Sequence, residues 1–343
     1  MEEEVVMAAS SGDAARGKNG VMVVEKVGGR STPTRCFSRY PLKLIIPSKA
    51  GVADSDAVWV YTVSFGGGIV SGDRISFDVR IGNDCTAAIK TQSSTKVYKA
   101  IGAKCSEQIL EAQVGSNALL AVLPDPVTCF AGARYSQKQI FRIVSNSNLI
   151  IVDWLTSGRH ERGEKWDFSL YKSTNNIFLE GDHPLFLDSV MSFCFQVVLE
   201  DSMDSTVADR MHNYQVTAML ILVGPKLKQI RNQIANDVKE TMSRLLQLPF
   251  AARSCYNKRQ KSQHTIEKPD FIASCSGIGN KVVDLIVLFS TFLPFIRNCR
   301  TSLDLQDIGL VVRIMAMTTE SVYKFLHQHL ACLASLLGAV PYS

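Results

Sequence analysis

The sequence predicts a mainly β protein built from stacked layers of strands, with helices only toward the C-terminus. Apolar and polar residues alternate over much of residues 21 to 225, as in Arg74 to Ile81, which is the period of a strand with one buried face. Three polar turns, at 82–84, 115–117 and 146–148, each lie between two such runs and recur at spacings of 33 and 31 residues. This recurrence indicates a loose structural repeat.

The composition excludes several classes of protein. The formal net charge of +5 is not gathered into a basic arm, and no aromatic-rich RNA-binding signature occurs, so we expect no nucleic-acid partner. No apolar run reaches the ~20 residues that span a bilayer, so we expect no membrane partner. Nine scattered cysteines without a C-x-x-C pair, and an acidic N-terminus unlike a signal peptide, indicate a cytoplasmic location.

The chain is expected to form one β-rich domain, residues 21–343, behind a disordered tail at 1–20 that is rich in Ala, Ser and Gly. A strand is expected over Val21–Val27. An apolar segment fenced by prolines follows at 40–47, and a short strand over Trp59–Phe65 leads into a glycine-rich stretch.

The glycine-rich stretch runs from Phe65 to Arg74 and holds four glycines between 66 and 72. A phosphate-binding loop is excluded, because no Lys-Ser/Thr pair follows and the stretch opens into a strand. The sequence therefore predicts a tight bend inside a β scaffold, with Asp73 facing a polar interior.

The later elements follow in order. The predicted strands are Arg74–Ile81, a strand through Ala87 to Thr91, Glu107–Val114, Ala118–Leu123, Tyr135–Val144, Leu149–Trp154, Phe193–Leu199, Tyr214–Val223, Phe271–Ser276 and Gly309–Met317. Apolar residues at steps of three and four predict one helix over 227–245 and a last helix from Thr318 or Thr319 to a stop at Gly338.

Five motifs resemble the urease accessory protein D family, and most closely its plant members. They are Gly66–Asp73, Thr91–Tyr98, Leu123–Pro126, Asp153–Glu164 and Met317–Glu320. The resemblance implies a β-helix-like stack of strands with two or three α-helices toward the C-terminus. It also implies a non-catalytic scaffold that binds accessory protein F, recruits the GTPase accessory protein G through F, and docks on apo-urease. Nickel would pass transiently through an internal, water-filled path.

Two groups of polar residues are candidates for that path. Gln92, Thr95 and Lys96 follow a strand and either line an internal channel or satisfy backbone groups in a buried turn. Asp125, held between Pro124 and Pro126, is either a transient oxygen ligand or an acceptor for its own turn.

The densest polar cluster surrounds His160, Glu161, Arg162 and Glu164. Imidazole and carboxylate are suitable nickel ligands in type, and a conduit requires only weak, few-ligand contacts. The alternative is an ion-paired surface loop in which arginines compensate the two glutamates. We favour a functional role for Arg162 and Glu164.

The last helix is a candidate contact with accessory protein F, through Thr319, Glu320, Tyr323 and His327, although its apolar stripe also suits core packing. His327 and His329 are two residues apart and point to different faces, so they cannot share a metal. Both histidines are expected on the helix surface.

One stretch departs from the family pattern. Strands at 276–281 and 309–313 should close a short hairpin, but 25 residues, 282–306, lie between them. The segment begins with Val and ends with Gln, whose codons can supply the GT and AG of intron boundaries. We interpret it as a retained intron or a gene-model artefact. A genuine membrane- or partner-binding insertion is the alternative.

Two other functions compete with the nickel scaffold. A β-helix carbohydrate-active enzyme would use Asp125 and Glu164 as paired acid and base. A plain interaction module would bind partners without a metal path. Hydrolase chemistry has no sequence support, because no nucleophile elbow occurs.

Overall fold

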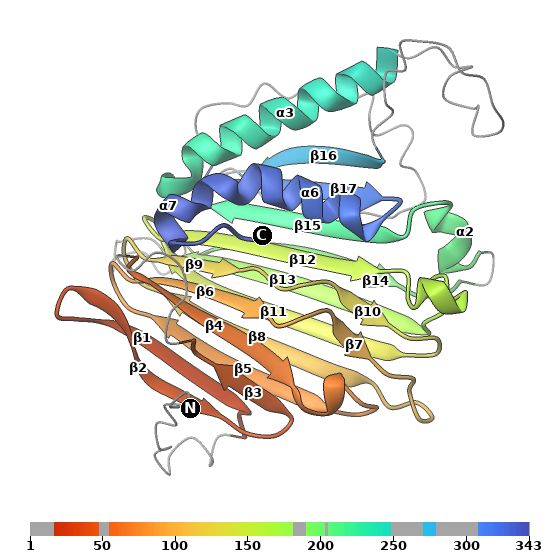
Figure 1. The fold of residues 1–343 in the computed structure, drawn as a ribbon, viewed down its shortest axis with the longest axis horizontal. Coiled ribbons are helices and arrows are strands. Elements are labelled where there is room, and N and C mark those ends of the chain that lie inside the picture. The colour runs from red at the N-terminus through yellow and green to blue at the C-terminus, as the bar shows by residue number, and fades with distance from the viewer. Residues whose placement is uncertain are drawn as a thin grey trace.

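The computed structural model describes residues 17–47, 55–180, 190–202, 205–247, 270–278 and 308–342. Two β-sheets face each other, and helices from the C-terminal part of the chain cover the outer face of one of them (Figure 1). The predicted fold class, a mainly β stack with late helices, is confirmed.

The first sheet has seven strands in the order β14-β13-β11-β8-β5-β1-β2. Its strands are β1 Gly20–Val27, β2 Arg30–Ser38, β5 Arg74–Ile81, β8 Ser106–Val114, β11 Arg134–Val144, β13 Leu170–Glu180 and β14 Val190–Leu199. The second sheet has ten strands. They are β3 Leu42–Ile45, β4 Ala57–Ser64, β6 Thr86–Thr91, β7 Thr95–Val97, β9 Leu119–Val122, β10 Val127–Cys129, β12 Asn148–Thr156, β15 Val216–Val223, β16 Phe271–Ile278 and β17 Gly309–Ala316.

The chain passes from one sheet to the other in successive coils. β5 leads to β6, β8 to β9 and β11 to β12, each through one of the three polar turns. The strands of successive coils pair in parallel within each sheet, as β5 with β8 and β6 with β9 do. The stacked layers predicted from the turn spacing are therefore present.

The three polar turns stack on one another through side-chain hydrogen bonds. Ser116 N donates to Asn83 Oδ1 at 2.9 Å, Asn117 Nδ2 to Asp84 Oδ1 at 2.7 Å, and Asn146 Nδ2 to Ser116 Oγ at 2.8 Å. Asp84 and Asn117 adopt positive φ, which Asn and Asp tolerate better than other residues with a side chain. Polar turn residues thus hold the coils in register.

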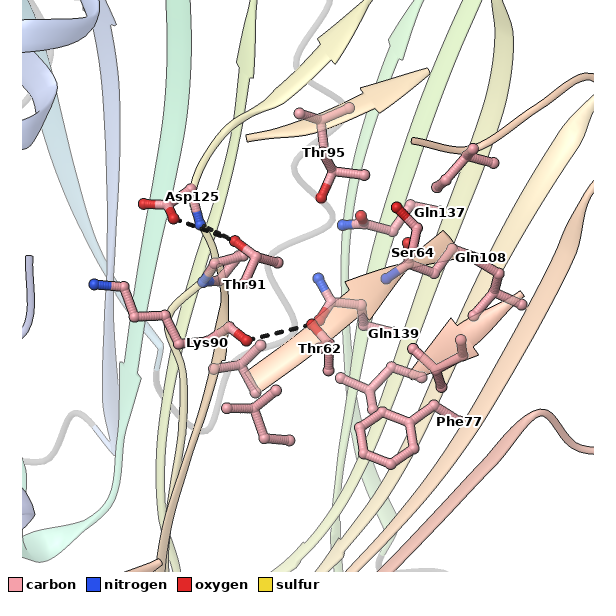
Figure 2. A pocket seen from close by; sticks show the side chains of 18 of the residues that line it. Thr62, Ser64, Phe77, Lys90, Thr91, Thr95, Gln108, Asp125, Gln137 and Gln139 are labelled. Carbon is pink, nitrogen blue, oxygen red and sulfur yellow. Dashed lines mark hydrogen bonds between the residues drawn. The ribbon is translucent and has the colours of Figure 1, made fainter. Parts of the chain in front are cut away.

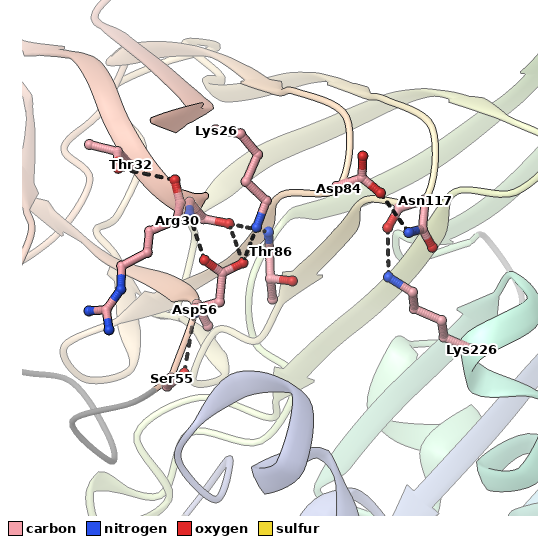
Figure 3. A network of polar contacts seen from close by, with 11 residues as sticks. Lys26, Arg30, Thr32, Ser55, Asp56, Asp84, Thr86, Asn117 and Lys226 are labelled. Atoms are coloured by element: carbon pink, nitrogen blue, oxygen red, sulfur yellow. Dashed lines mark hydrogen bonds and ion pairs between the residues drawn. The ribbon is translucent and has the colours of Figure 1, made fainter. Parts of the chain in front are cut away.

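A second polar network ties the β1–β2 hairpin to the coils (Figure 3). Asp56 forms an ion pair with Lys26 and accepts from Ser31 N at 2.6 Å and from Ser31 Oγ at 2.8 Å. Ser31 Oγ also accepts from Thr86 N at 3.0 Å, at the start of β6. The hairpin is anchored to the second sheet at the same end as the turn stack.

The hydrophobic residues form two cores, one between the sheets and one between the second sheet and the helices. Strand β12 lies between them and is buried along its whole length. Leu149, Ile151 and Leu155 face the first core, whereas Ile150 and Trp154 face the second. On the inter-sheet side this alternation is broken by a carboxylate, Asp153, which organises the site described below.

The helical elements are η1 Phe65–Gly67, η2 His160–Arg162, α2 Val207–Met211, η3 Pro225–Leu227, α3 Lys228–Gln247, α6 Thr319–Leu330, η6 Ala331–Leu333 and α7 Ala334–Leu337. The predicted stripe of α3 packs on the second sheet through Ile230, Ile234 and Val238. Thr318 caps α6 by accepting from Ser321 N at 3.2 Å, as expected from the Thr-rich start of this helix. Gly338 ends α7 at φ 72°.

The predicted hairpin at the edge of the second sheet is confirmed. β16 and β17 pair in antiparallel register, with Ile278 opposite Gly309, and Ile308 N donates to Ile278 O at 2.9 Å. The segment 282–306 lies outside the described residues. The last described residue before it, Ile278, and the first after it, Ile308, lie side by side.

Three expectations need correction. Residues 17–20 belong to the fold rather than to the predicted tail, since Lys18 Nζ lies 2.8 Å from Asp78 Oδ1 and β1 begins at Gly20; residues 1–16 lie outside the described residues. Strands β2, β7, β10 and β13 were not predicted. His329 is buried, with 7% of its surface exposed, because it falls one and two turns after the buried Phe325 and Val322 on the apolar stripe of α6.

In the described part of the chain, no helix has the length and apolar content that crossing a bilayer requires.

Candidate functional site: a polar pocket between the sheets

A small pocket lies between the two sheets where β4, β6 and β9 end (Figure 2). Its volume is about 80 Å³, which is room for a few water molecules. Apolar side chains such as Ile69, Phe77 and Leu110 form most of its wall. Polar side chains from both sheets supply the rest: Thr62, Ser64, Lys90, Thr91, Thr95, Gln108, Asp125, Gln137, Gln139 and Asp153. The inter-sheet core thus contains a pocket in which polar side chains gather among apolar ones.

Asp153 is the buried centre of this interior. It accepts hydrogen bonds from Ser173 Oγ at 2.5 Å, Asn175 Nδ2 at 2.7 Å, Gln137 Nε2 at 3.2 Å and Tyr171 OH at 3.4 Å. These donors come from β11 and β13, which place them opposite β12. A buried carboxylate is stabilised only when such donors compensate for lost hydration.

The network leaves acceptor capacity unused. Asn175 is fully buried, and its Oδ1 has no hydrogen-bond partner among the described residues. Gln139, 5% exposed, borders the pocket, and Figure 2 shows its amide turned toward Thr62. Buried amide oxygens without protein partners are expected to bind water or a cation.

Asp125 borders the pocket beside the C-terminal helices. Its Oδ1 accepts from Tyr323 OH at 2.9 Å, and its backbone N donates to Thr91 Oγ1 at 2.7 Å. The preceding Pro124 O accepts from Trp154 Nε1 at 2.8 Å and from Tyr342 OH at 2.9 Å. The Pro-Asp-Pro turn is therefore fixed from β12, from α6 and from the C-terminal segment.

The protonation of Asp153 should make stability depend on pH. Burial raises the pKa of this carboxyl above its ordinary value, although its hydrogen-bond donors oppose the rise. Between the ordinary and the raised pKa the folded protein binds a proton that the unfolded chain has released, so the free energy of unfolding falls as pH rises through that window. Asp153→Asn cannot titrate.

We therefore expect the difference in unfolding free energy, wild type minus Asp153→Asn, to increase as pH is lowered from about 7 to about 4.5. The limit is about 1.4 kcal/mol for each unit by which the pKa is raised. Urea unfolding of both proteins at each pH measures it. A constant difference, or one that shrinks at low pH, would contradict the assignment.

The candidates from the Thr91–Tyr98 motif and the glycine bend have different positions. Thr95 lines the pocket, as Asp125 does, whereas Gln92 and Lys96 are exposed and lie outside the lining. Asp73 was expected to face the interior, but its Oδ2 accepts from Val70 N at 3.0 Å and closes its own turn. Alternation along β7 explains Lys96, which points outward while Val97 is buried.

The cluster around His160 lies on η2 and is not part of the pocket. His160, Glu161 and Arg162 are exposed. Gly163, at φ 80°, turns the chain so that Glu164 returns to Arg159. The Arg159 guanidinium lowers the pKa of the Glu164 carboxyl, and it also stacks 4.0 Å from the Phe130 ring centroid.

This arrangement argues against the carbohydrate-active enzyme. Glu164 lies outside the lining to which Asp125 belongs, so the proposed acid and base do not share a site. A carboxylate kept charged by an ion pair is also a poor general acid.

The four helix residues predicted to contact a partner divide into two groups. Glu320 and His327 are exposed, and Thr319 is half-buried; Glu320 forms an ion pair with Lys324 at 2.8 Å. Tyr323 instead turns inward to Asp125. The partner contact stays a prediction.

Four residues of this site were not predicted from the sequence: Asp153, Gln137, Gln139 and Asn175. Two signals for a polar interior were present in the sequence. Asp153 is the single charge in the apolar run Leu149–Trp154, and Gln137 and Gln139 occupy inward positions of the alternating strand β11. Asn175 could not be found, since β13 carries polar residues on both faces and was not predicted as a strand.

Comparisons with known proteins give the family of the chain. The family model described as UreD urease accessory protein matches residues 17–343. Urease accessory protein D of Arabidopsis thaliana is 55% identical over 324 residues, covering 94% of this chain and 99% of that protein. The same-named protein of Oryza sativa subsp. japonica is 52% identical over 342 residues, covering 100% and 99%. Urease accessory protein UreD of Sorangium cellulosum is 36% identical over 213 residues, 62% of this chain and 64% of that protein.

Fold and pocket together define a scaffold of stacked β coils that encloses a small polar interior and is covered by helices on one side. The chain belongs to the urease accessory protein D family. This membership supports a role in urease maturation.

Proposed function

We propose that this protein is a non-catalytic scaffold of urease maturation and that nickel on its way to the urease active site passes through the polar pocket. One observation carries the proposal. A pocket that is lined by both Asp125 and Asp153, together with neutral amide and hydroxyl groups, lies inside a mainly apolar core. Such a polar interior is costly to build unless polar guests use it.

The donor set suits a passing ion. Carboxylate, amide and hydroxyl oxygens are harder ligands than imidazole or thiolate and hold a divalent transition metal loosely. No group of three or more His, Cys, Asp or Glu within the described ranges could hold a metal. Two carboxylates and several neutral oxygens along one lining favour transfer from one contact to the next over storage.

We further propose that accessory protein F binds the α6 side, that the GTPase accessory protein G is recruited through F, and that apo-urease receives the nickel. Glu320 and His327 on α6 are exposed for such a contact. The hydrogen bond from Tyr323 to Asp125 would connect that surface to the pocket. Cys36, Cys85, Cys105 and Cys129 are free thiols, which supports a reducing cytoplasmic setting.

Co-expression with urease and both accessory proteins tests the proposal, with the nickel content of purified urease as the readout. Asp125→Asn keeps the shape of the side chain but loses its charge. It is expected to lower nickel content about fivefold, equivalent to about 1 kcal/mol of lost ion stabilisation, while accessory protein F still co-purifies.

The matched control is Glu111→Gln on the outer face of the first sheet, where the carboxylate is half exposed, and it should load nickel normally. Normal nickel content in Asp125→Asn urease would contradict the conduit. The same assay with residues 282–306 deleted shows whether that segment is needed.

A further inference from the structure

Large apolar side chains are exposed around the glycine bend, and the proposed role of the pocket does not explain them. Of the six large apolar side chains most exposed among the described residues, four are Tyr40, Phe65, Val70 and Ile101, between 44% and 73% exposed. Such side chains gathered at one place mark an interaction surface more often than scattered ones do.

The four residues lie in two pairs, one at each end of the glycine bend. The rings of Tyr40 and Phe65 lie 5.9 Å apart between centroids. Ile101 N donates to Ser71 Oγ at 2.8 Å, which places the Ile101 turn beside the residue that follows Val70. We call Tyr40, Phe65, Val70 and Ile101, with the lysines described next, the bend patch.

Three exposed lysines border these apolar residues. A Cβ on Gly68 would lie 2.7 Å from Lys96 O, and one on Gly72 would lie 3.4 Å from Lys104 Cδ, so both lysines adjoin the bend. Lys99 lies within three residues of both Lys96 and Ile101. No carboxylate within the described ranges pairs with these lysines.

The nearby acidic side chains are already engaged. Asp73 accepts from Val70 N, and Glu107 lies 2.8 Å from Arg74. The bend patch is therefore apolar and positively charged. A complementary partner surface would be acidic with an apolar side chain at its centre.

The shape of the bend patch is set by backbone contacts. Ile69 N donates to Lys96 O at 2.8 Å and Tyr98 N to Ile69 O at 2.9 Å, and only glycine at 68 allows this approach to β7. Ile69 is buried in the pocket lining while its neighbour Val70 is exposed. Because backbone hydrogen bonds fix the positions of these side chains, the bend patch is better suited to bind a protein of matching shape than a deformable lipid surface.

The position points to one partner. Ser64, which lines the pocket, directly precedes Phe65, and Figure 2 shows Ser64 and Gln108 across the pocket from Asp125. Figure 1 places η1, at the bend, away from α6 and α3. The bend patch thus adjoins the side of the pocket remote from the helices.

We infer that the bend patch is the docking surface for an acidic, partly apolar face of apo-urease. The choice of apo-urease rests on the proposed function: if accessory protein F binds the α6 side, the protein that receives the nickel binds on the remote side. The glycine motif then has a physical role, because it brings the bend onto β7 and turns Phe65 and Val70 outward.

The test measures the affinity of immobilised apo-urease for the complex of this chain with accessory protein F. The charge-reversed variant Lys96→Glu/Lys99→Glu/Lys104→Glu should bind at least about tenfold more weakly than wild type. Raising the salt concentration should weaken wild type more than this variant. Lys138→Glu/Lys172→Glu, on the exposed outer face of the first sheet, is the matched control and should bind as wild type does.

A second variant, Ile101→Ser, removes one apolar contact without changing charge, and a threefold or greater loss of affinity is expected. Urease binding equal to wild type in both variants overturns the proposal. So does a loss seen only with phosphatidylserine vesicles, or only in self-association measured by light scattering, since these outcomes assign the patch to a lipid surface or to a second copy of the chain.

The experiments distinguish a failure of the proposed nickel path from a failure of the proposed docking surface. Asp125→Asn should retain urease binding, whereas the charge-reversed variant should lose it and still bind accessory protein F. If Asp125→Asn loads nickel normally, the conduit is wrong, and the binding result for the bend patch stands by itself.

Discussion

Replacing Trp154 with alanine is expected to lower the free energy of unfolding by about 3–5 kcal/mol, the usual cost of removing a large buried aromatic side chain. Trp154 is 2% exposed, and its ring lies edge-on to Tyr323 at 4.8 Å and to Tyr342 at 6.2 Å between centroids. Its indole also donates to Pro124 O. The substitution removes both the packing and the support of the Asp125 turn. Urea unfolding measures the loss.

Trp154→Phe is the matched control. It keeps most of the packing and removes the indole donor, so about 1–2 kcal/mol should be lost. A loss below about 1.5 kcal/mol for Trp154→Ala would show that the helices close over the vacancy at little cost, and the Asp125 turn would then not depend on this residue.

The second large effect is expected from Gln139→Leu, which keeps nearly the same volume but replaces a polar wall of the pocket with an apolar one. An ion passing this wall loses an oxygen contact, at a cost of about 1 kcal/mol or more, so urease nickel content should fall at least about fivefold. Stability should change little, since Gln139 lies outside the hydrogen-bond network of Asp153.

Two measurements on Gln139→Leu separate loss of an ion contact from loss of protein stability. Nickel content is determined in co-expressed urease, and the free energy of unfolding is determined on purified protein. A stable variant that loads nickel normally would show that ions do not pass Gln139. Gln113→Leu on the outer face of the first sheet, where Gln113 pairs with Arg142 in register, controls for loss of an amide.

The coils could be predicted from sequence because each carries its own signals. A period of two marked β5, β8 and β11, a continuous apolar run marked β12, and the polar turns marked where each coil bends. β13 gave no such signal, since Ser173 and Asn175 occupy inward positions where an apolar residue would be expected. Ser173 and Asn175 both donate hydrogen bonds to Asp153. The residues that make the interior polar are therefore the same ones that remove the apolar alternation from β13.

The pocket itself could be predicted only in part. Asp125 and Thr95 follow strands visibly in sequence, but Asp153, Gln137 and Asn175 come from three different strands and meet only when the sheets face each other. The cluster at His160–Glu164 was prominent in the sequence but does not belong to the pocket. Its charge density is clear in sequence, yet Gly163 directs Glu164 back to Arg159 and away from the pocket.

The β16–β17 hairpin has a consequence for the chain's tolerance of different lengths. Pairing continues to Ile278 and Gly309, so a chain of any length between these two residues must have its ends brought together, at a cost in loop-closure entropy. That entropy changes by only about 0.6 kcal/mol for each doubling of length. Transcripts with and without the codons for 282–306 should therefore both give proteins that reach the same fold, differing by about 2 kcal/mol at most. Splicing at this position could vary without destroying the scaffold.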